Sequence, residues 1–270
     1  MQLSGEVLDH IFSFLVSHKD TLIACLKDPA LSPSAERHFY RHIAVLFCRP
    51  IQNDFGGEAT PVDFFQPHHL SKLVSEKPHI LSYVQILTIR VGTHPHAIGQ
   101  EDHVQVARDL NEFATTLLMF PALKCIMLTT DLNWSEADMF RAALEDRINL
   151  PTIKEVHLAG RQILPLSSLD SCKNIKNLSL LHGPIQVDGK PCISTLPKLR
   201  SLTLSPPFDS PPLLAWLKLH ITELRFLSLK CDRSSVEAEL LQVCSETLYE
   251  LDINLLNSRC KVYSLPSMHH

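Results

Sequence analysis

A short hydrophobic frame recurs along most of this chain. It has the form apolar-x-x-apolar-x-apolar and is clearest at residues 199–204, which read Leu-Arg-Ser-Leu-Thr-Leu. The last two apolar positions lie two residues apart, which is the spacing of side chains on one face of a β-strand. Copies of the frame occupy residues 84–89, 123–128, 153–158, 175–180, 199–204, 224–229 and 248–253. We therefore expect a series of equivalent strands.

The intervals between the copies indicate how the strands are joined. The last five copies begin 22 to 25 residues apart, whereas the first two intervals are longer. Intervals of this size are typical of leucine-rich repeats, in which one strand and one return segment form each unit. Stacked units bury their apolar faces, and their strands pair into one parallel, curved sheet. The frame lacks the Asn that follows it in many such repeats, so we expect an irregular solenoid.

The polar positions between the frame residues predict a binding surface. Because side chains alternate along a strand, these positions point out on the concave face of the sheet. A flanking column on this face contains Glu155, Asn177 and Glu250. The candidate substrate-binding residues are Thr88, Arg90, Met127, His157, Ser179, Thr203, Phe226, Ser228, Lys230 and Asp252. This mixture of small polar and a few large side chains suits the recognition of a protein.

The first 48 residues have helical spacing instead. Ser4 is a suitable N-cap for a helix over residues 3–16, and Asp20 for a second helix over 21–27. Ser32-Pro33 opens a third helix, which we expect to continue to about Phe47. The first helix has apolar residues at three- and four-residue spacing, namely Val7, Leu8, Ile11, Phe12 and Leu15. Three short helices predict a compact helical module.

These helices resemble the F-box. Residues 3–15 are similar to its opening, Leu-Pro-x-Glu-hydrophobic-Leu-x-x-Ile-Phe-x-x-Leu, with Ser4 in place of the usual Pro. Residues 21–40 resemble the second half of the F-box in fungal proteins, with Leu31 where Trp is usual. Residues 69–89 and 139–151 are similar to later segments of the mushroom-type fungal F-box/leucine-rich-repeat-like family.

This resemblance implies an organisation and a function. The fold would be α/β: an F-box-like three-helix module at 1–48, a linker or loop at 49–68, and a leucine-rich-repeat-like domain at 69–270. In the family, the helices bind a Skp-type adaptor of a cullin-based ubiquitin ligase, and the repeat domain binds a protein substrate. The corresponding adaptor-binding residues are Leu3, Ser4, Glu6, Val7, Leu8, Ile11, Phe12 and Leu15.

A second hypothesis is a scaffolding repeat protein in which the N-terminal helices only cap the solenoid. Solenoids need such caps to cover the apolar edge of the first repeat. In either case, the protein would act through binding and would not be an enzyme.

Composition narrows the classes of function. The net charge of −4 on 270 residues predicts neither a nucleic acid nor a membrane as partner. The eight cysteines include no Cys-x-x-Cys, and no signal peptide is evident, so we expect a reduced cytoplasmic or nuclear protein. The fifteen histidines include no HExxH, and the chain lacks Gly-x-Ser-x-Gly and P-loop motifs. We therefore predict no catalytic, cofactor-binding or metal-binding residues, and no cofactor.

Overall fold

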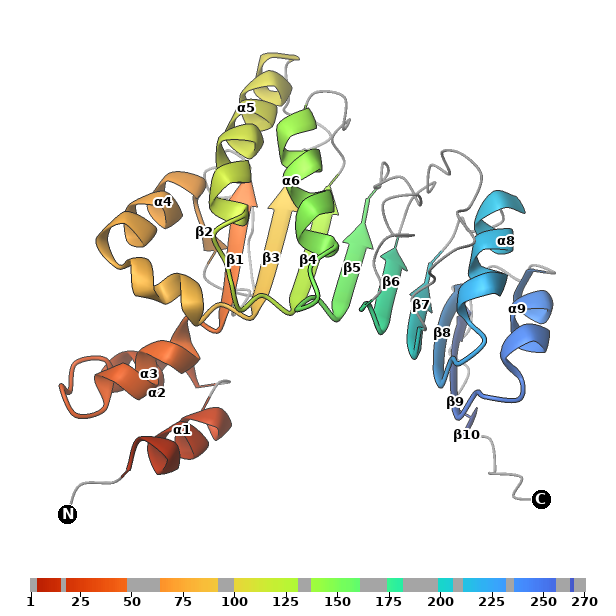
Figure 1. Cartoon of the computed structure of the whole chain (residues 1–270), viewed down its shortest axis with the longest axis horizontal. Helices are drawn as coiled ribbons and strands as arrows, with labels where there is room; N and C mark the ends of the chain where they lie inside the picture. The colour runs from red at the N-terminus through yellow and green to blue at the C-terminus, as the bar shows by residue number, and fades with distance from the viewer. Residues whose placement is uncertain are drawn as a thin grey trace.

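The structure is a computed structural model, which describes residues 4–15, 18–47, 64–91, 100–130, 137–160, 174–181, 199–205, 211–231, 236–255 and 263–264. Within these residues the chain is α/β, with a single open sheet and helices packed on one of its faces (Figure 1). A separate group of three helices lies at one end of the sheet (Figure 1).

The sheet has ten strands, and its central strands follow one another in chain order. The strands are β1 (His42–Phe47), β2 (Phe64–Phe65), β3 (Ile86–Val91), β4 (Cys125–Thr130), β5 (Glu155–Ala159), β6 (Asn177–Leu181), β7 (Ser201–Leu204), β8 (Phe226–Cys231), β9 (Glu250–Leu255) and β10 (Tyr263–Ser264). Their order is β10-β9-β8-β7-β6-β5-β4-β3-β1-β2. All neighbours are parallel except β10, which runs antiparallel to β9. The predicted α/β class with a parallel sheet is confirmed.

The hydrophobic frame explains the core. The middle apolar residue of each copy pairs in register with that of the next copy, from Leu87 through Ile126, Val156, Leu178, Leu202 and Leu227 to Leu251. The first six of these side chains are at most 3% exposed. Full burial of such a side chain contributes about 1.5–3 kcal/mol, so each member of this row adds to the hydrophobic stabilisation of the sheet core.

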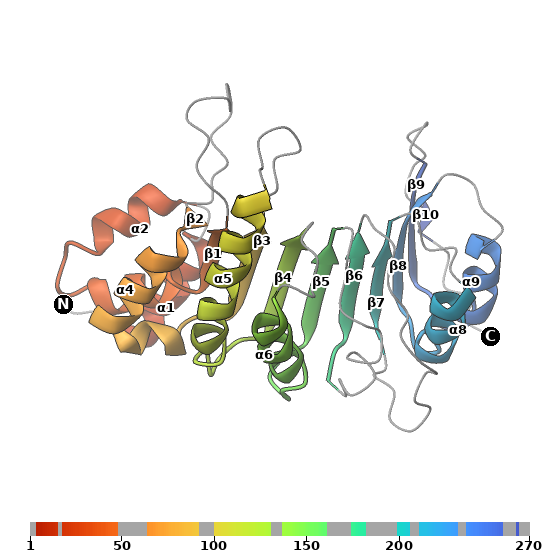
Figure 2. The ribbon, with the colours of Figure 1, turned by 90° about the horizontal axis from the view of Figure 1, so that it is seen from above.

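Helices return the chain across one face of the sheet. They are α4 (Pro67–Glu76), the 3₁₀ helix η1 (Pro78–Ser82), α5 (Gln100–Leu117), α6 (Asp138–Ile148), α8 (Pro211–His220) and α9 (Val236–Cys244). Seen from above, α5, α6, α8 and α9 lie on the same side of the sheet (Figure 2). The apolar stripe of α5, which includes Leu110, Phe113 and Leu117, is buried against the strands. None of the described helices lies over the opposite face, and we call it the open face.

The first strand corrects the predicted length of the third helix. The helix α3 (Ser32–Phe39) ends well before Phe47, and β1 follows it and pairs with β3 along its whole length. Ile43 and Val45 are fully buried, and their β-branched side chains favour a strand. The helical part of the predicted 1–48 module therefore ends near Tyr40. Residues 49–63 of the linker predicted at 49–68 lie outside the described residues. Its residues 64–68 contribute to β2 and α4.

The first two helices, α1 (Gly5–Phe14) and α2 (Lys19–Cys25), pack with α3 around a small separate core. Phe12, Leu22 and Ala35 are its buried members. The Oγ atom of Ser4 accepts a hydrogen bond of 3.4 Å from the backbone N–H of Val7, which confirms Ser4 as the N-cap of α1. We call the α1–α3 unit the helical module.

A buried carboxylate joins the helical module to the sheet domain. Glu36 of α3 is 9% exposed and accepts hydrogen bonds from Lys77 Nζ at 2.7 Å and His79 Nε2 at 2.9 Å. Burial raises the pKa of Glu36, but the hydrogen bonds and positive charges of these two partners lower it further, to below its ordinary value. The carboxylate therefore stays ionised and holds α3 against the start of η1.

Candidate functional site

Helix α1 exposes an apolar stripe. Val7, Ile11 and Phe14 are 45%, 42% and 69% exposed. Their spacing of four and three residues places them on one side of the helix. We call these three residues the α1 stripe. Phe14 is the most exposed of them, although it is not among the adaptor-binding residues expected from the sequence. Phe14 follows Val7 by seven residues, and this spacing in the sequence could have placed both on the same side of the helix.

The structure divides the other predicted adaptor-binding residues into two groups. Ser4 and Glu6 are exposed at the start of α1. Leu8 and Leu15 are partly buried against the core of the helical module, and Phe12 is only 3% exposed within it. Phe12 is therefore a core residue and not an accessible contact, because its side of α1 faces α2 and α3. Leu3 lies outside the described residues.

An ion pair fixes the orientation of α1 on the module. Arg37 Nη2 of α3 donates hydrogen bonds to both carboxylate oxygens of Asp9, at 2.8 and 2.9 Å. Burial raises the pKa of Asp9, but hydrogen bonds from Arg37 and Ser34 and the charge of Arg37 lower it below its ordinary value. Asp9 therefore holds α1 against α3 while the α1 stripe faces outward.

Most of the predicted substrate-binding residues lie on the open face. Arg90 and Met127 are exposed, and six others are partly exposed: Thr88, His157, Thr203, Phe226, Lys230 and Asp252. Ser179 and Ser228, by contrast, are 5% and 7% exposed, which corrects their prediction as surface contacts. Their side chains are short and lie in register between larger residues of the adjacent strands.

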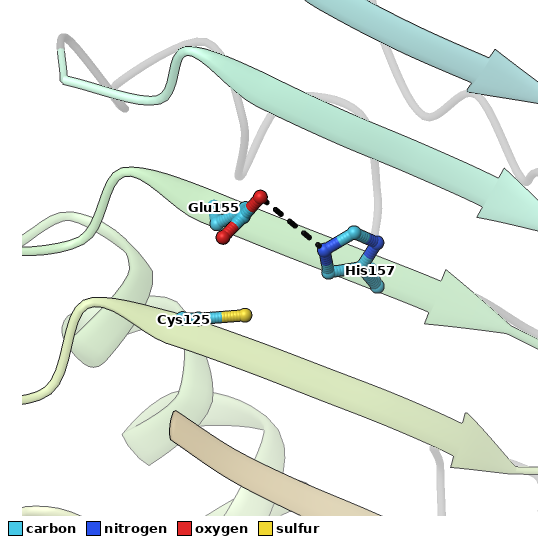
Figure 3. Close-up of side chains that lie close together, drawn as sticks. All are labelled: Cys125, Glu155 and His157. Carbon is cyan, nitrogen blue, oxygen red and sulfur yellow. Dashed lines mark ion pairs between the residues drawn. The ribbon is translucent and has the colours of Figure 1, made fainter. Parts of the chain in front are cut away.

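Strands β4 and β5 bring three potential metal ligands together on this face. Cys125 pairs in register with Glu155, and His157 follows Glu155 by two residues, so all three side chains point the same way (Figure 3). One donor atom of each residue lies within 4.8 Å of the others. His157 Nε2 is 3.9 Å from Glu155 Oε1, which also accepts a hydrogen bond of 2.9 Å from Asn177 Nδ2 on β6. We call Cys125, Glu155 and His157 the β4–β5 triad.

Burial controls the protonation of the triad. Burial raises the pKa of the Cys125 thiol to about 12, and the charge of Glu155 and the hydrogen bond that the thiol donates to this carboxylate add to the effect. Burial also lowers the pKa of His157, against the opposing effect of the Glu155 charge. In the absence of a metal, the triad therefore holds a protonated thiol and a neutral imidazole at neutral pH.

No metal-binding residue is predicted from the sequence. Glu155 and His157 are expected on the concave face, whereas Cys125 is one of eight cysteines that form no recognisable metal-binding motif. The repeated frame could have connected the three residues, because aligning residues 123–128 with 153–158 puts Cys125 opposite Glu155.

A row of basic residues lines the edge where the strands begin. The residue just before each of the strands β1 and β4–β8 is basic: Arg41, Lys124, Lys154, Lys176, Arg200 and Arg225. We call this row the basic edge. Backbone hydrogen bonds join neighbouring members of this row. The carbonyl of Lys124 accepts from the N–H of Lys154, and the carbonyl of Lys154 accepts from the N–H of Lys176. The strands start along one common edge (Figure 1).

The described surface also has a shallow groove of about 780 Å³ beside α5. Val104, Arg108 and Met139 are among its lining residues, and Met139 is 62% exposed. The described lining residues also include Glu112 and Thr115 but neither a cysteine nor a histidine.

Among the described helices, none is both long enough and apolar enough to span a bilayer. No protein-family model and no curated protein matches this sequence.

Proposed function

We propose that this protein is a substrate-recognition adaptor that resembles the F-box subunits of cullin-based (SCF-type) ubiquitin ligases. The observation that carries the proposal is the α1 stripe. Its three apolar side chains remain exposed although the helical module already has its own filled core. An apolar stripe of this kind on a small module is typical of a surface that another protein covers.

In this proposal the two parts of the chain bind different proteins. The α1 stripe binds a Skp-type adaptor, which connects the chain to the cullin complex, and the open face binds a protein substrate. The chain performs no chemical step itself. It raises the effective concentration of the substrate near a ubiquitin-charged enzyme, as linked binding sites do. This role belongs to the cytoplasm, the nucleus or both.

Binding of a purified Skp-type adaptor tests the proposal. The wild-type chain is expected to retain the adaptor in a pull-down and to bind it in a calorimetric titration. Ile11→Asp combined with Phe14→Asp is expected to remove binding, because a carboxylate buried in an apolar interface loses its hydration. Phe12→Asp is unsuitable for this test, since Phe12 is buried and the variant would disrupt the module.

A matched control is Met119→Asp combined with Val243→Asp, which changes two exposed apolar residues of the sheet domain. This variant is expected to bind the adaptor as the wild type does. Absence of binding by the wild-type chain contradicts the proposal. Undiminished binding by the α1 variant, with circular dichroism showing a folded chain, contradicts it as well.

The Glu36 contact favours a second candidate function, a scaffolding repeat protein capped by the helical module. The helical module lies at the β1–β2 end of the sheet, where a cap would be needed (Figure 1), and Glu36 joins this module to Lys77 and His79. Solubility of residues 41–270, which keep β1, discriminates the two candidates. Aggregation of this fragment, together with a full-length chain that does not bind the adaptor, favours the scaffolding protein capped by the helical module.

A further inference from the structure

We propose that Cys125, Glu155 and His157 form a zinc-binding site on the open face. A sulfur, a carboxylate oxygen and an imidazole nitrogen are the donor atoms that zinc takes in proteins. Magnesium and calcium prefer oxygen donors alone, so this donor set discriminates against them. The proposal is independent of adaptor binding, because the triad and the α1 stripe lie on different elements.

The geometry requires only a small adjustment. Zinc bonds of about 2.0–2.3 Å in a tetrahedral site place donor atoms about 3.5 Å apart. The three donor atoms already lie within 4.8 Å of one another, and Glu155 and His157 are 3.9 Å apart. The side chains of Glu155 and His157 are 39% and 31% exposed, so both can rotate toward a bound ion. Cys125 is 5% exposed, which keeps its sulfur in place.

The surrounding sheet supports the ligands. All three residues sit on paired strands, which hold a site more firmly than loops do. Asn177 on β6 donates to Glu155 Oε1 and so orients the carboxylate, and this oxygen keeps a second lone pair for the ion. Binding replaces the thiol proton by the metal, and this proton passes to solvent. Three protein ligands leave one coordination position, which a water molecule occupies on the solvent side of the sheet.

Cobalt substitution tests this site with the full-length chain. One equivalent of Co²⁺, added to metal-free reduced protein, is expected to produce tetrahedral visible bands and a sulfur-to-cobalt charge-transfer band. One equivalent of Zn²⁺ is expected to remove both. Cys125→Ser is expected to abolish the charge-transfer band, and His157→Asn to weaken Zn²⁺ binding at least tenfold in competition with a chromogenic chelator. Asn177→Ala is expected to weaken it about tenfold, as loss of a residue that orients a ligand typically does.

Other cysteines and histidines provide the controls. Cys25→Ser changes a cysteine of the helical module, and His68→Asn combined with His69→Asn removes a neighbouring histidine pair. Both variants are expected to keep the wild-type spectrum and affinity. Absence of a charge-transfer band in the folded wild-type chain overturns the proposal. Retention of the band in Cys125→Ser, or wild-type affinity in His157→Asn, shows adventitious binding and overturns it too. His157 is partly exposed, so its variant remains informative if Cys125→Ser fails to fold.

The basic edge leads independently to a second proposal, which rests on the proposed adaptor function and concerns the chemistry of the substrate. We infer that this edge binds an extended acidic segment of the protein substrate. Lys124, Lys154, Lys176, Arg200 and Arg225 precede five consecutive strands. At about 4.8 Å per strand, the row from Lys124 to Arg225 spans about 19 Å, which is the length of about six extended residues.

The charges of this row are not compensated by ion pairs among the described residues. Lys124 donates to the Gln85 side chain, Lys154 donates to the carbonyl of Pro151, and Arg225 lies over the Tyr249 ring. The backbone positions of adjacent members are about 4.8 Å apart, which is less than the screening length of about 8 Å, so their like charges repel. The repulsion is notable in a chain whose net charge is −4. An acidic segment of the substrate that lies across the strands would neutralise these charges and remove the repulsion.

Fluorescence anisotropy with labelled ten-residue peptides tests this second proposal. A peptide rich in Asp and Glu is expected to bind the full-length chain more tightly at low salt, and a neutral peptide of equal length is expected not to bind. Lys176→Glu combined with Arg200→Glu is expected to lower the affinity for the acidic peptide at least tenfold. The control variant, Lys72→Glu combined with Arg108→Glu, reverses two exposed charges elsewhere and is expected to keep the affinity.

Equal affinity of the edge and control variants for the acidic peptide overturns this proposal. Tighter binding of a ten-nucleotide single-stranded RNA than of the peptide also overturns it, because the edge then recognises nucleic acid. The same variants are tested for binding to the Skp-type adaptor. An edge variant that loses the peptide but keeps the adaptor separates this inference from the adaptor proposal.

Discussion

At the scale of single residues, Arg147 is the clearest case of a buried charge with a structural task. It is 5% exposed and donates to the carbonyls of Leu117, Leu118 and Phe120, at 2.9, 2.7 and 2.6 Å. These carbonyls belong to the end of α5 and the turn after it, where helix geometry leaves acceptors without partners. Burial lowers the pKa of Arg147, but a guanidinium remains charged in proteins.

Arg147→Ala is expected to lower the free energy of unfolding by about 3 kcal/mol, because buried carbonyls then lose charged donors. Arg147→Lys is expected to recover only part of this loss, since an ammonium lacks the fork that reaches several carbonyls. Urea unfolding measures both. Arg141→Ala, which removes only an exposed pair with Asp138, serves as control and is expected to cost less than about 1 kcal/mol. Equal stabilities of the Arg147 and Arg141 variants would contradict the capping role.

Gly160 supplies a second prediction at this scale. Its φ angle is +126°, and a Cβ atom there would lie 1.6 Å from the carbonyl oxygen of Thr130. Gly160→Ala is therefore expected to lower the free energy of unfolding by at least about 2 kcal/mol. Gly5→Ala is the matched control, because no atom lies within 4 Å of its added Cβ. The control is expected to be neutral or slightly stabilising, and thermal unfolding compares the two. A wild-type melting temperature for Gly160→Ala would refute the close contact.

At the scale of elements, the contact between α3 and η1 depends on pH through Glu36. The folded state holds the pKa of the Glu36 carboxyl below the ordinary pKa of a glutamate. The contact therefore stabilises the protein fully at pH values above that ordinary pKa. The stabilisation is lost as pH falls through the lowered pKa, below about pH 4. Glu36→Gln is expected to cost about 1 kcal/mol at neutral pH, since its partners are half exposed.

The difference in stability between wild type and Glu36→Gln is therefore expected to shrink as pH falls below 4. Urea unfolding over a range of pH measures this difference. Glu76→Gln is a suitable control, because the pair that Glu76 forms with Lys72 is exposed. A difference that stays constant down to the lowest pH would show that the Glu36 charge does not hold the two elements together.

At the scale of the whole molecule, two cores of unequal size are joined by few contacts. The helical module buries Phe12, Leu22 and Ala35, whereas the sheet domain has one continuous core from Ile43 to Leu248. Regions with few buried apolar residues open at lower free energy. Amides of α1 and α2 are therefore expected to exchange with deuterium faster than those of β4–β7, and Glu36→Gln is expected to speed up the module alone. Equal protection in both regions would contradict this picture.

The pattern of apolar residues predicts the central sheet well, because the frame is local and repeats. Aligning the copies also gives the strand register, as the pairing of Leu178 with Leu202 illustrates. The same local pattern was misleading at Ile43 and Val45, which were assigned to the third helix. Their strand conformation depends on pairing with β3, more than forty residues further along the chain.

The candidate sites were predicted less completely, because they depend on which side of an element is covered. Helical spacing identifies the apolar residues of α1 but does not say whether Phe12 or Phe14 faces the core. Packing of α1 against α3, fixed by Asp9 and Arg37, decides this. The alternation of strand residues places Ser179 on the open face, yet its larger neighbours bury it.

By itself, then, the sequence determined the parallel strands β3–β9 and their order, because a two-residue apolar period repeated at regular intervals leaves little choice of pairing. Only the tertiary structure decided which groups meet across those strands. Cys125, Glu155 and His157 gather because β4 and β5 pair in one register, and the basic edge forms because the strands begin at one level. Both arrangements join residues that are distant in the chain, and such contacts depend on the packing of the whole sheet.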